Sequence, residues 1–218
     1  MTDFIYDGPG SAATTILLAH GAGAPMDSDW MNATADALAA RGFRVARFEF
    51  GYMAARRKGE RPPPAPANRL IGEYLAALKA VEGTGRLVIG GKSLGGRMAS
   101  MIAQKLYGEG RIAGLLCLGY PFHPPGNPQK LRTDHLTPLT VPTLICQGER
   151  DPFGTREEVA GYPLSGSTEV FWLPDGDHDL KPRKASGLTF RDNLAAACDR
   201  IRDWIDALPP GSSDDSSR

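Results

Sequence analysis

Residues 87–97 constrain the fold of this chain more than any other stretch. They read Leu-Val-Ile-Gly-Gly-Lys-Ser-Leu-Gly-Gly-Arg, so three apolar residues suited to a buried strand run into glycines, a serine and more glycines. Residues 98–106 continue as a helix-like stretch. Glycine is needed on both sides of Ser93 because a side chain would collide with a neighbouring strand or helix at so tight a turn. The stretch predicts a strand, a sharp turn with Ser93 at its apex, and a helix.

Two motifs overlap at this turn, and they imply different chemistry. The segment from Gly91 to Gly95 fits G-x-S-x-G, in which a strained turn exposes the serine hydroxyl above a sheet. Gly-Gly-Lys-Ser also resembles the end of a phosphate-binding P-loop, but that motif needs a glycine where Arg86 stands. Residues 87–89, which would then form an open loop, suit a buried strand instead. The sequence therefore favours a serine nucleophile over a nucleotide site.

The composition fits one domain over residues 1–208. Of the 218 residues, 41% are hydrophobic, and the 25 basic residues balance the 25 acidic ones. Without net charge, no global field draws the chain to nucleic acid or to an anionic membrane. The N-terminus lacks the basic and apolar segments of a secretory signal, and nowhere do about 18 apolar residues follow one another. We therefore expect a cytoplasmic protein with no nucleic-acid or membrane partner, and a disordered tail over residues 209–218.

Strand-like and helix-like stretches alternate along the chain. The expected strands are residues 4–6, 14–19, 44–50, 87–89, 112–118, 143–146 and 169–173. The expected helices are residues 30–41, 70–81, 98–106 and 193–208. This alternation predicts an α/β protein with a largely parallel sheet covered by helices on both faces. Ligands of such sheets bind beyond the carboxyl ends of the strands, so functional residues are expected there.

Residues 53–68 interrupt this alternation. They contain the basic triplet Arg56, Arg57 and Lys58, followed by four prolines, and we expect a loop that is extended where it is proline-rich. The basic triplet either attracts an anionic substrate or forms ordinary solvated surface, and the sequence leaves both interpretations open.

Three residues that follow strands suit covalent catalysis by serine. A free hydroxyl is a poor nucleophile, so it needs a base to take its proton, and the base needs an acid to orient it. Ser93, Asp151 and His178 each follow an expected strand and occur in the order Ser, Asp, His. Asp175 and Asp177 lie nearer to His178 in sequence and compete for the role of the acid.

In these features the chain resembles the α/β-hydrolase superfamily over residues 14–208. It is most similar to small lidless members such as dienelactone-hydrolase-like proteins, and to a branch that includes subunits of an animal histone-acetyltransferase (NSL) complex. The resemblance rests on His20-Gly21-Ala22-Gly23, Gly91-Lys92-Ser93-Leu94-Gly95-Gly96-Arg97, Gly148-Glu149-Arg150-Asp151 and Gly176-Asp177-His178. It implies a mostly parallel central sheet of about seven strands, helices on both faces and no large lid. Dienelactone hydrolases use a cysteine nucleophile where this chain has Ser93, so their substrate is not carried over.

The resemblance also implies a role for each catalytic residue. Ser93 is expected to be the nucleophile, His178 the base, and Asp151 the acid, because the acid of this family follows the preceding strand. The competing histidines are His20, His123 and His135. They either belong to the oxyanion loop or precede the acid in the chain, which would break the order of the family.

Two further groups of site residues are expected. The oxyanion hole should consist of the backbone N–H groups of Leu94 and Ala22, with Gly23 as the alternative to Ala22. The residues expected to line a substrate pocket are Tyr120, Phe122 and Phe153, with Trp172 as a further candidate. No cofactor is implied, and the three scattered cysteines show neither a disulfide framework nor the spacing of a metal site.

The function expected from this reading is a serine hydrolase of the carboxylesterase type. It would cleave small soluble esters through an acyl-enzyme on Ser93, without a cofactor. Residues 120–142 are rich in proline and polar groups, so no amphipathic lid helix is expected and the site should favour short acyl chains. The alternatives are a non-catalytic scaffold for protein interaction, or a thioesterase or peptidase on the same triad. The expected partner is a small-molecule ester, and formation of a homodimer is left open.

Overall fold

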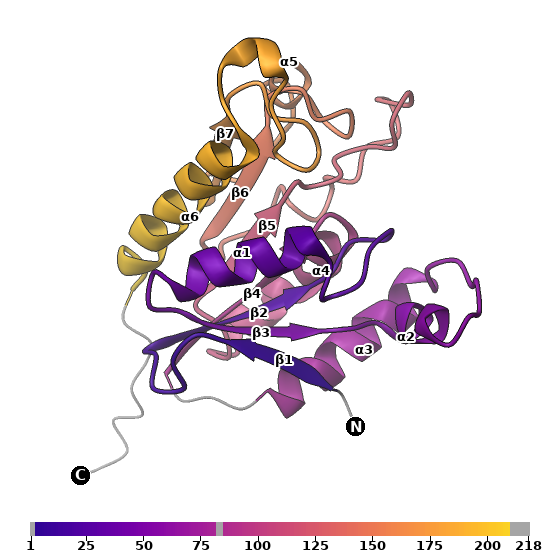
Figure 1. Ribbon diagram of the computed structural model, residues 1–218, viewed down its shortest axis with the longest axis vertical. Coiled ribbons are helices and arrows are strands. Elements are labelled where there is room, and N and C mark those ends of the chain that lie inside the picture. Colours follow the sequence, from indigo (N-terminus) through magenta and orange to yellow (C-terminus); the bar gives the residue numbers. More distant parts are fainter. Residues whose placement is uncertain (1–2, 82–84, 210–218) are drawn as a thin grey trace.

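The computed structural model describes residues 3–81 and 85–209, which form a seven-stranded sheet with helices on both faces (Figure 1). The strands are β1 Phe4–Asp7, β2 Thr14–Ala19, β3 Arg44–Phe48, β4 Arg86–Lys92, β5 Gly114–Leu118, β6 Thr143–Gly148 and β7 Thr168–Leu173. The helices are α1 Asp29–Ala39, α2 Gly51–Arg57, α3 Ala67–Ala80, α4 Leu94–Gly108, α5 Arg156–Val159 and α6 Phe190–Asp206, with a 3-10 turn over Lys184–Ser186. Of the expected tail, residues 210–218 lie outside the described residues.

The sheet has the strand order β1-β3-β2-β4-β5-β6-β7. Only the edge strand β1 runs antiparallel, against β3, and the other described pairs are parallel. Parallel strands need helices on both faces, which explains why every residue of β2, β5 and β6 is buried. The carboxyl ends of β2, β4, β6 and β7 therefore open onto the same edge of the sheet, where a ligand would bind.

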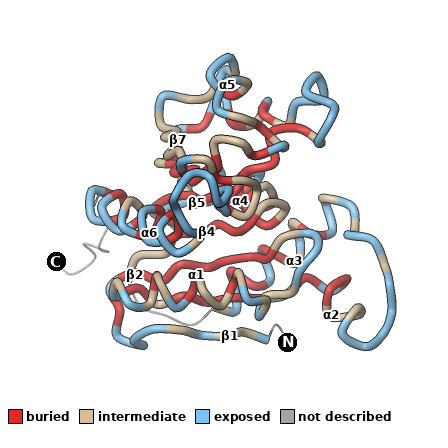
Figure 2. The backbone as a smooth tube through the Cα atoms, turned by 45° about the horizontal axis from the view of Figure 1, so that its top comes forward, coloured by how far each residue is buried: buried red, intermediate tan, exposed pale blue. Residues whose placement is uncertain are grey.

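Two hydrophobic layers separate the sheet from its helices. On one face Leu17, Ile89 and Leu115 pack with residues of α3 and α4, and on the other Ile16 and Val88 pack with residues of α1 and α6. Figure 2 shows the result as buried strands in the middle and helices whose outer sides are exposed. Successive side chains of a strand thus pack alternately into two separate cores. Packed on both faces, the sheet is a rigid base for the loops at its carboxyl edge.

The structure corrects the prediction that residues 53–68 are entirely a loop. Residues 51–57 form α2, and α3 begins at Ala67. The reason is tertiary, because Tyr52 and Met53 are buried in the core, and this burial stabilises a helix of two turns that its sequence alone would not hold. A smaller difference concerns α6, which begins at Phe190 because the Thr189 side chain caps it.

The connection between β5 and β6, all of whose residues are described, contains neither a helix nor a strand. It is nevertheless fastened to the body of the protein. The Arg132 N–H donates to the carbonyl of Phe122 at 2.8 Å, and Leu136 and Leu139 are buried. The fold therefore has no large lid, as predicted. Among the described residues, none of the helices combines the length and apolarity needed to cross a bilayer.

Candidate active site

The turn between β4 and α4 holds Ser93 in a strained backbone conformation. Its φ of 50° and ψ of −111° lie outside the regions that a non-glycine residue prefers. Ser93 N–H donates to the Leu118 carbonyl on the neighbouring strand at 3.0 Å, which holds the turn in place. A Cβ at Gly91 or at Gly95 would collide with the carbonyl oxygen of Ala19. The predicted strand, turn and helix are therefore confirmed, together with the steric reason for the glycines.

Ser93, His178 and Asp151 form a continuous chain of hydrogen bonds. His178 Nε2 lies 2.9 Å from Ser93 Oγ, and His178 Nδ1 lies 2.7 Å from Asp151 Oδ2. The three residues come from three strand ends, those of β4, β6 and β7. Because Asp151 accepts at Nδ1, the neutral imidazole presents its lone pair at Nε2 toward the serine hydroxyl. The arrangement can transfer the hydroxyl proton to the histidine while the oxygen attacks an electrophile.

Asp151 is fully buried, and its carboxylate is surrounded by donors. Oδ2 accepts from Gln147 Nε2 at 2.9 Å as well as facing His178, and Oδ1 accepts from the Phe153 N–H at 2.8 Å. Gln147 is itself held by the backbone N–H and carbonyl of Tyr120, at 2.7 and 3.2 Å. A buried carboxylate is tolerated only with such partners. Sequence reasoning missed Gln147, although a glutamine in an otherwise apolar strand was a signal.

The two competing aspartates do not contact His178. Asp175 forms ion pairs with Arg183 and Arg150, and the hydrogen bonds from Arg183 lower the pKa of its carboxyl to about 2. Asp177 Oδ1 accepts the backbone N–H groups of two following residues. Both carboxylates therefore shape the loop that carries the histidine instead of contacting its ring.

The other histidines are also engaged elsewhere. His20 is fully buried, and its Nε2 accepts the Phe50 N–H at 3.1 Å. Burial lowers the pKa of His20, so the ring stays neutral. It supports the loop that begins at Gly21. His123 is buried against the carbonyl of Pro124, and His135 contacts Ser100.

Lys92, the residue before the serine, is buried and reaches across to the histidine loop. Its ammonium donates to the backbone carbonyl of His178, lies 3.4 Å from Asp179 Oδ1 and sits 5.2 Å from the Trp30 ring centre. Burial lowers the pKa of Lys92. The side chain thus ties the strand before the nucleophile to the loop that carries the base. Sequence reasoning weighed this lysine only as part of a P-loop and gave it no role.

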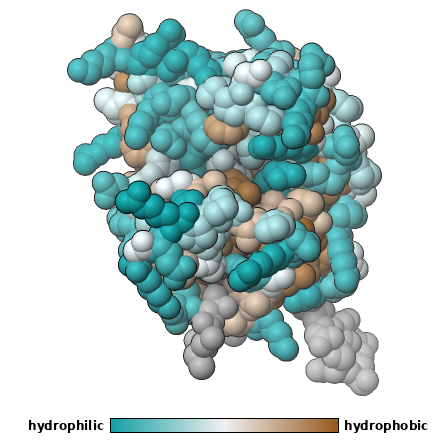
Figure 3. All heavy atoms as spheres, turned by 90° about the vertical axis from the view of Figure 1, so that its right-hand side faces the viewer, coloured by the Kyte–Doolittle hydropathy of each residue, from teal (hydrophilic) through white to brown (hydrophobic). Residues whose placement is uncertain are grey.

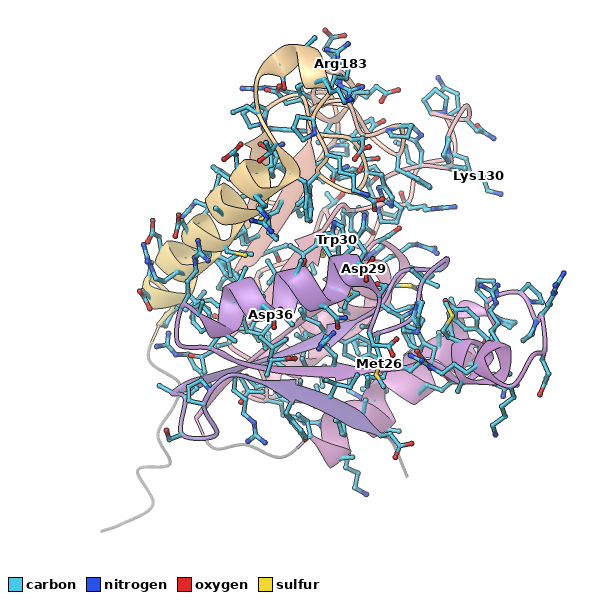
Figure 4. All side chains as sticks on the ribbon, viewed as in Figure 1. Met26, Asp29, Trp30, Asp36, Lys130 and Arg183 are labelled. Atoms are coloured by element: carbon cyan, nitrogen blue, oxygen red, sulfur yellow. The ribbon has the colours of Figure 1, made fainter. Side chains whose placement is uncertain are left out.

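A cavity of about 520 Å³ opens beside Ser93 and His178. Residues 21–24 form one wall, the start of α1 with Trp30 forms another, and Phe153 lies over the histidine at 4.2 Å between ring centres. Trp30 and Asp29 are marked at the start of α1 in Figure 4. Figure 3 shows the face at the carboxyl edge of the sheet, where hydrophobic residues gather in the middle among hydrophilic ones. The cavity can therefore hold a small, partly apolar molecule against the serine.

The aromatic residues expected around this cavity divide into two groups. Phe153 lines it, as predicted. Tyr120 and Phe122 do not, because both are fully buried in the core and pack edge to face at 4.9 Å between ring centres. The expectation that they line the pocket is therefore corrected. Trp172 packs against the same core from β7 and is not part of the cavity wall either.

Of the residues expected to supply oxyanion donors, one follows the serine in the chain and the other belongs to the cavity wall. Leu94 is the first residue of α4, so its N–H belongs to the free first turn of that helix. Ala22 and Gly23 both line the cavity. Tyr52 and Arg56 of α2 each donate to the Ala22 carbonyl at 3.3 Å, which orients the loop.

The basic triplet of the sequence therefore has a defined place. Arg56 supports the loop of residues 21–24, and Arg57 pairs with Glu49 and Asp27 on the surface beside it. Within this triplet, only the exposed Lys58 has a side chain that makes no such contact to another described residue. Most of the charge of the triplet is thus engaged within the chain, which favours neither of the two interpretations left open by the sequence.

The sheet order, the strained serine turn and the bonded Ser, His and Asp define an α/β serine hydrolase fold. A family model of the alpha/beta hydrolase domain matches residues 12–206, and the chain belongs to that family.

Solved structures support the same fold. A lidless α/β serine hydrolase from Xanthomonas campestris is 19% identical, with 95% of this chain and 91% of that chain covered and a TM-score of 0.69. For a dienelactone hydrolase from Anabaena variabilis the identity is 19%, the coverage 95% and 92%, and the TM-score 0.68. For an α/β serine hydrolase homologue from Coxiella burnetii the identity is 17%, the coverage 93% of this chain and 89% of that chain, and the TM-score 0.67. At such low identity the likeness extends to the fold alone.

Proposed function

We propose that the protein is a serine esterase that cleaves small soluble carboxylic esters through an acyl-enzyme. The observation that carries this proposal is the pair of hydrogen bonds, 2.9 and 2.7 Å, that links Ser93 Oγ to His178 and His178 to Asp151. A serine held at a strained, glycine-flanked turn with a base in contact is arranged for nucleophilic attack.

The reaction would proceed in two halves. Ser93 Oγ attacks the ester carbonyl carbon and passes its proton to His178 Nε2, while Asp151 stabilises the resulting imidazolium. The tetrahedral intermediate carries its negative charge on the former carbonyl oxygen, toward the N–H groups of Leu94 and Ala22. His178 then gives its proton to the departing alcohol, and the acyl group stays on Ser93.

Water completes the cycle by the same route in reverse. His178 takes a proton from a water molecule, whose oxygen attacks the acyl carbon, and the proton returns to Ser93 Oγ as the acid leaves. Small esters are favoured because the cavity of about 520 Å³ is compact and has aromatic walls at Trp30 and Phe153. Thioesters and amides could react at the same triad, so they belong in the substrate panel.

Labelling with a fluorophosphonate probe tests the nucleophile directly. The wild-type protein should bind the probe covalently, and Ser93→Ala should not, because the substitution removes the attacking oxygen. Hydrolysis of p-nitrophenyl acetate should fall by several powers of ten in Ser93→Ala, whereas circular dichroism should be unchanged. Equal hydrolysis by a folded Ser93→Ala protein would refute the proposal. Hydrolysis of a thioester or amide well above that of matched esters would instead reassign the substrate class.

A further inference from the structure

A group of basic side chains lies close to the nucleophile but outside the cavity. It consists of Arg97 on α4 and of Arg132 and His135 in the connection between β5 and β6, and we call it the basic cluster. All three side chains are half-buried, and none of them lines the cavity beside Ser93. The reaction derived above does not use them.

The two guanidinium groups of the basic cluster have no anionic partner in the described part of the chain. Within residues 3–81 and 85–209, neither Arg97 nor Arg132 forms an ion pair or a side-chain hydrogen bond, and the Nε–H of Arg97 is buried without an acceptor. Several other arginines that are buried or half-buried pair with carboxylates. Arg47, for example, bonds to Asp7 and Asn32. A buried guanidinium donor without an acceptor is destabilising unless a ligand supplies one.

The positive charges of the basic cluster also repel one another. The pKa of Arg132 is lowered, first by burial and then by the charge of Arg97. The pKa of His135 is lowered by the same two causes, in the same order, and only Asp134 acts in the other direction. Tyr120 is the remaining titratable neighbour, and burial keeps its hydroxyl protonated. Two cations held together in a partly desolvated place provide a strong field for an anion.

A hydrogen-bonded framework holds the basic cluster in this arrangement. The Ser100 hydroxyl donates to the carbonyl of Arg97 at 2.7 Å, and the Tyr120 hydroxyl donates to the carbonyl of Arg132 at 2.9 Å. His135 Nε2 lies 2.8 Å from the first hydroxyl and 3.3 Å from the second. Because both hydroxyl hydrogens are already donated, His135 Nε2 must be the donor to them. The backbones of both arginines are thus fixed to one half-buried imidazole.

Arg97 connects the basic cluster to the turn that carries the nucleophile. Arg97 N–H donates to the Ser93 carbonyl, so the two residues are four apart on one face of the first turn of α4. A separation of four residues is roughly 6 Å along a helix axis, and helical side chains lean toward the N-terminus. This helical geometry predicts that the Arg97 side chain extends toward the turn that carries the nucleophile.

We propose that the basic cluster binds an oxyanionic group, a carboxylate or phosphate, carried by the ester substrate. Guanidinium groups match both oxyanions with paired N–H donors. The basic cluster does not line the cavity. The anionic group would therefore lie at the basic cluster, outside the cavity, while the ester bond lies at Ser93. This inference rests on the proposed function for its substrate, but the existence of an oxyanion site can be tested without hydrolysis.

The first test measures binding of inorganic phosphate to the full chain carrying Ser93→Ala. Phosphate should raise the thermal midpoint above that in sodium chloride of equal ionic strength. Adding Arg97→Gln or Arg132→Gln should abolish this shift, because each removes one guanidinium. Lys130→Gln is the matched control, since Lys130 lies exposed two residues from Arg132 and is marked near the outer tip of the same connection (Figure 4). An equal shift in all variants, or none in any, would overturn the oxyanion site whether or not the protein is an esterase.

The second test assigns the anion to the substrate. The mono-p-nitrophenyl ester of adipic acid ends in a carboxylate, whereas p-nitrophenyl hexanoate has the same chain length without the charge. The ratio of their kcat/KM values should fall roughly tenfold or more in Arg97→Gln and in Arg132→Gln, and less in Arg97→Lys, which keeps the charge. Lys130→Gln should keep the wild-type ratio. A ratio that Arg97→Gln and Lys130→Gln change equally would refute the assignment to the substrate.

Discussion

At the scale of single residues, Asp151 shows how burial and hydrogen bonding jointly define a site. The carboxylate has no exposed surface, and donors from Gln147, Phe153 and His178 surround its two oxygens. Such an ion is stable in the interior only while these donors remain. The same donors fix the direction of the carboxylate, so the histidine ring is held in one orientation and one tautomer.

Replacing this carboxylate by an amide therefore tests the assignment of the acid. Asp151→Asn should reduce kcat by roughly 10³- to 10⁴-fold, because the amide favours the wrong tautomer of His178. Asp175→Asn and Asp177→Asn are the matched controls, since their side chains bond to arginines or to backbone N–H groups and not to the ring. Steady-state kinetics with p-nitrophenyl acetate measures the effect. A loss in either control as large as that in Asp151→Asn would contradict the assignment.

At the scale of elements, the structure of the connection between β5 and β6 bears on whether a lid covers the serine. It has no regular secondary structure, and it is fastened by the bond from Arg132 N–H to the Phe122 carbonyl and by buried leucines. A segment held in this way can form a rim, but it lacks the large apolar face needed to open on a lipid surface. The cavity beside His178 is therefore open to water without a lid movement.

This architecture predicts a preference for short acyl chains. Hydrolysis of p-nitrophenyl esters should fall as the acyl chain grows from about four to about twelve carbons, although each buried methylene can contribute about 0.8 kcal/mol where a pocket accepts it. The rate should also show no jump when the substrate exceeds its solubility limit. Fastest hydrolysis of the longest chain, or activation at an emulsion surface, would show that the connection works as a lid after all.

At the scale of the whole molecule, one buried and one half-buried histidine couple folding to pH. The pKa values of His20 and His135 are lowered from 6.5, mainly by burial. Between the folded pKa and 6.5 the unfolded chain binds more protons than the folded one, so the free energy of unfolding rises with pH in this window and levels off above it. Carboxylates with lowered pKa values, such as Asp175, lose their contribution only at more acidic pH.

We therefore expect the protein to become less stable on mild acidification. Urea denaturation from about pH 8 to about pH 5 should show a falling free energy of unfolding below the ordinary histidine pKa. His20→Gln and His135→Gln should each flatten part of this dependence, because each removes one of the two bases with a lowered pKa. The same slope in the wild type and in a folded double variant would assign the effect to other groups.

The sequence by itself determined the local structure around the nucleophile and the general plan of the sheet. A turn from strand to helix as sharp as the one at Ser93 needs glycine at positions 91 and 95. The turn could therefore be predicted from neighbouring residues alone. Apolar runs and helical periodicity predicted each strand and most helices to within a few residues. The order of Ser93, Asp151 and His178 then indicated which residues could meet, and the structure brings them into hydrogen-bond contact.

Only the tertiary structure decided what surrounds those residues. The helix α2, the burial of Tyr120 and the reach of Lys92 to the His178 loop all depend on contacts between distant parts of the chain. The basic cluster likewise joins α4 to the connection after β5. Local periodicity carries no information about such contacts, because they arise from the order β4-β5-β6-β7 of the strands, which places sequence-distant loops side by side at one edge of the sheet.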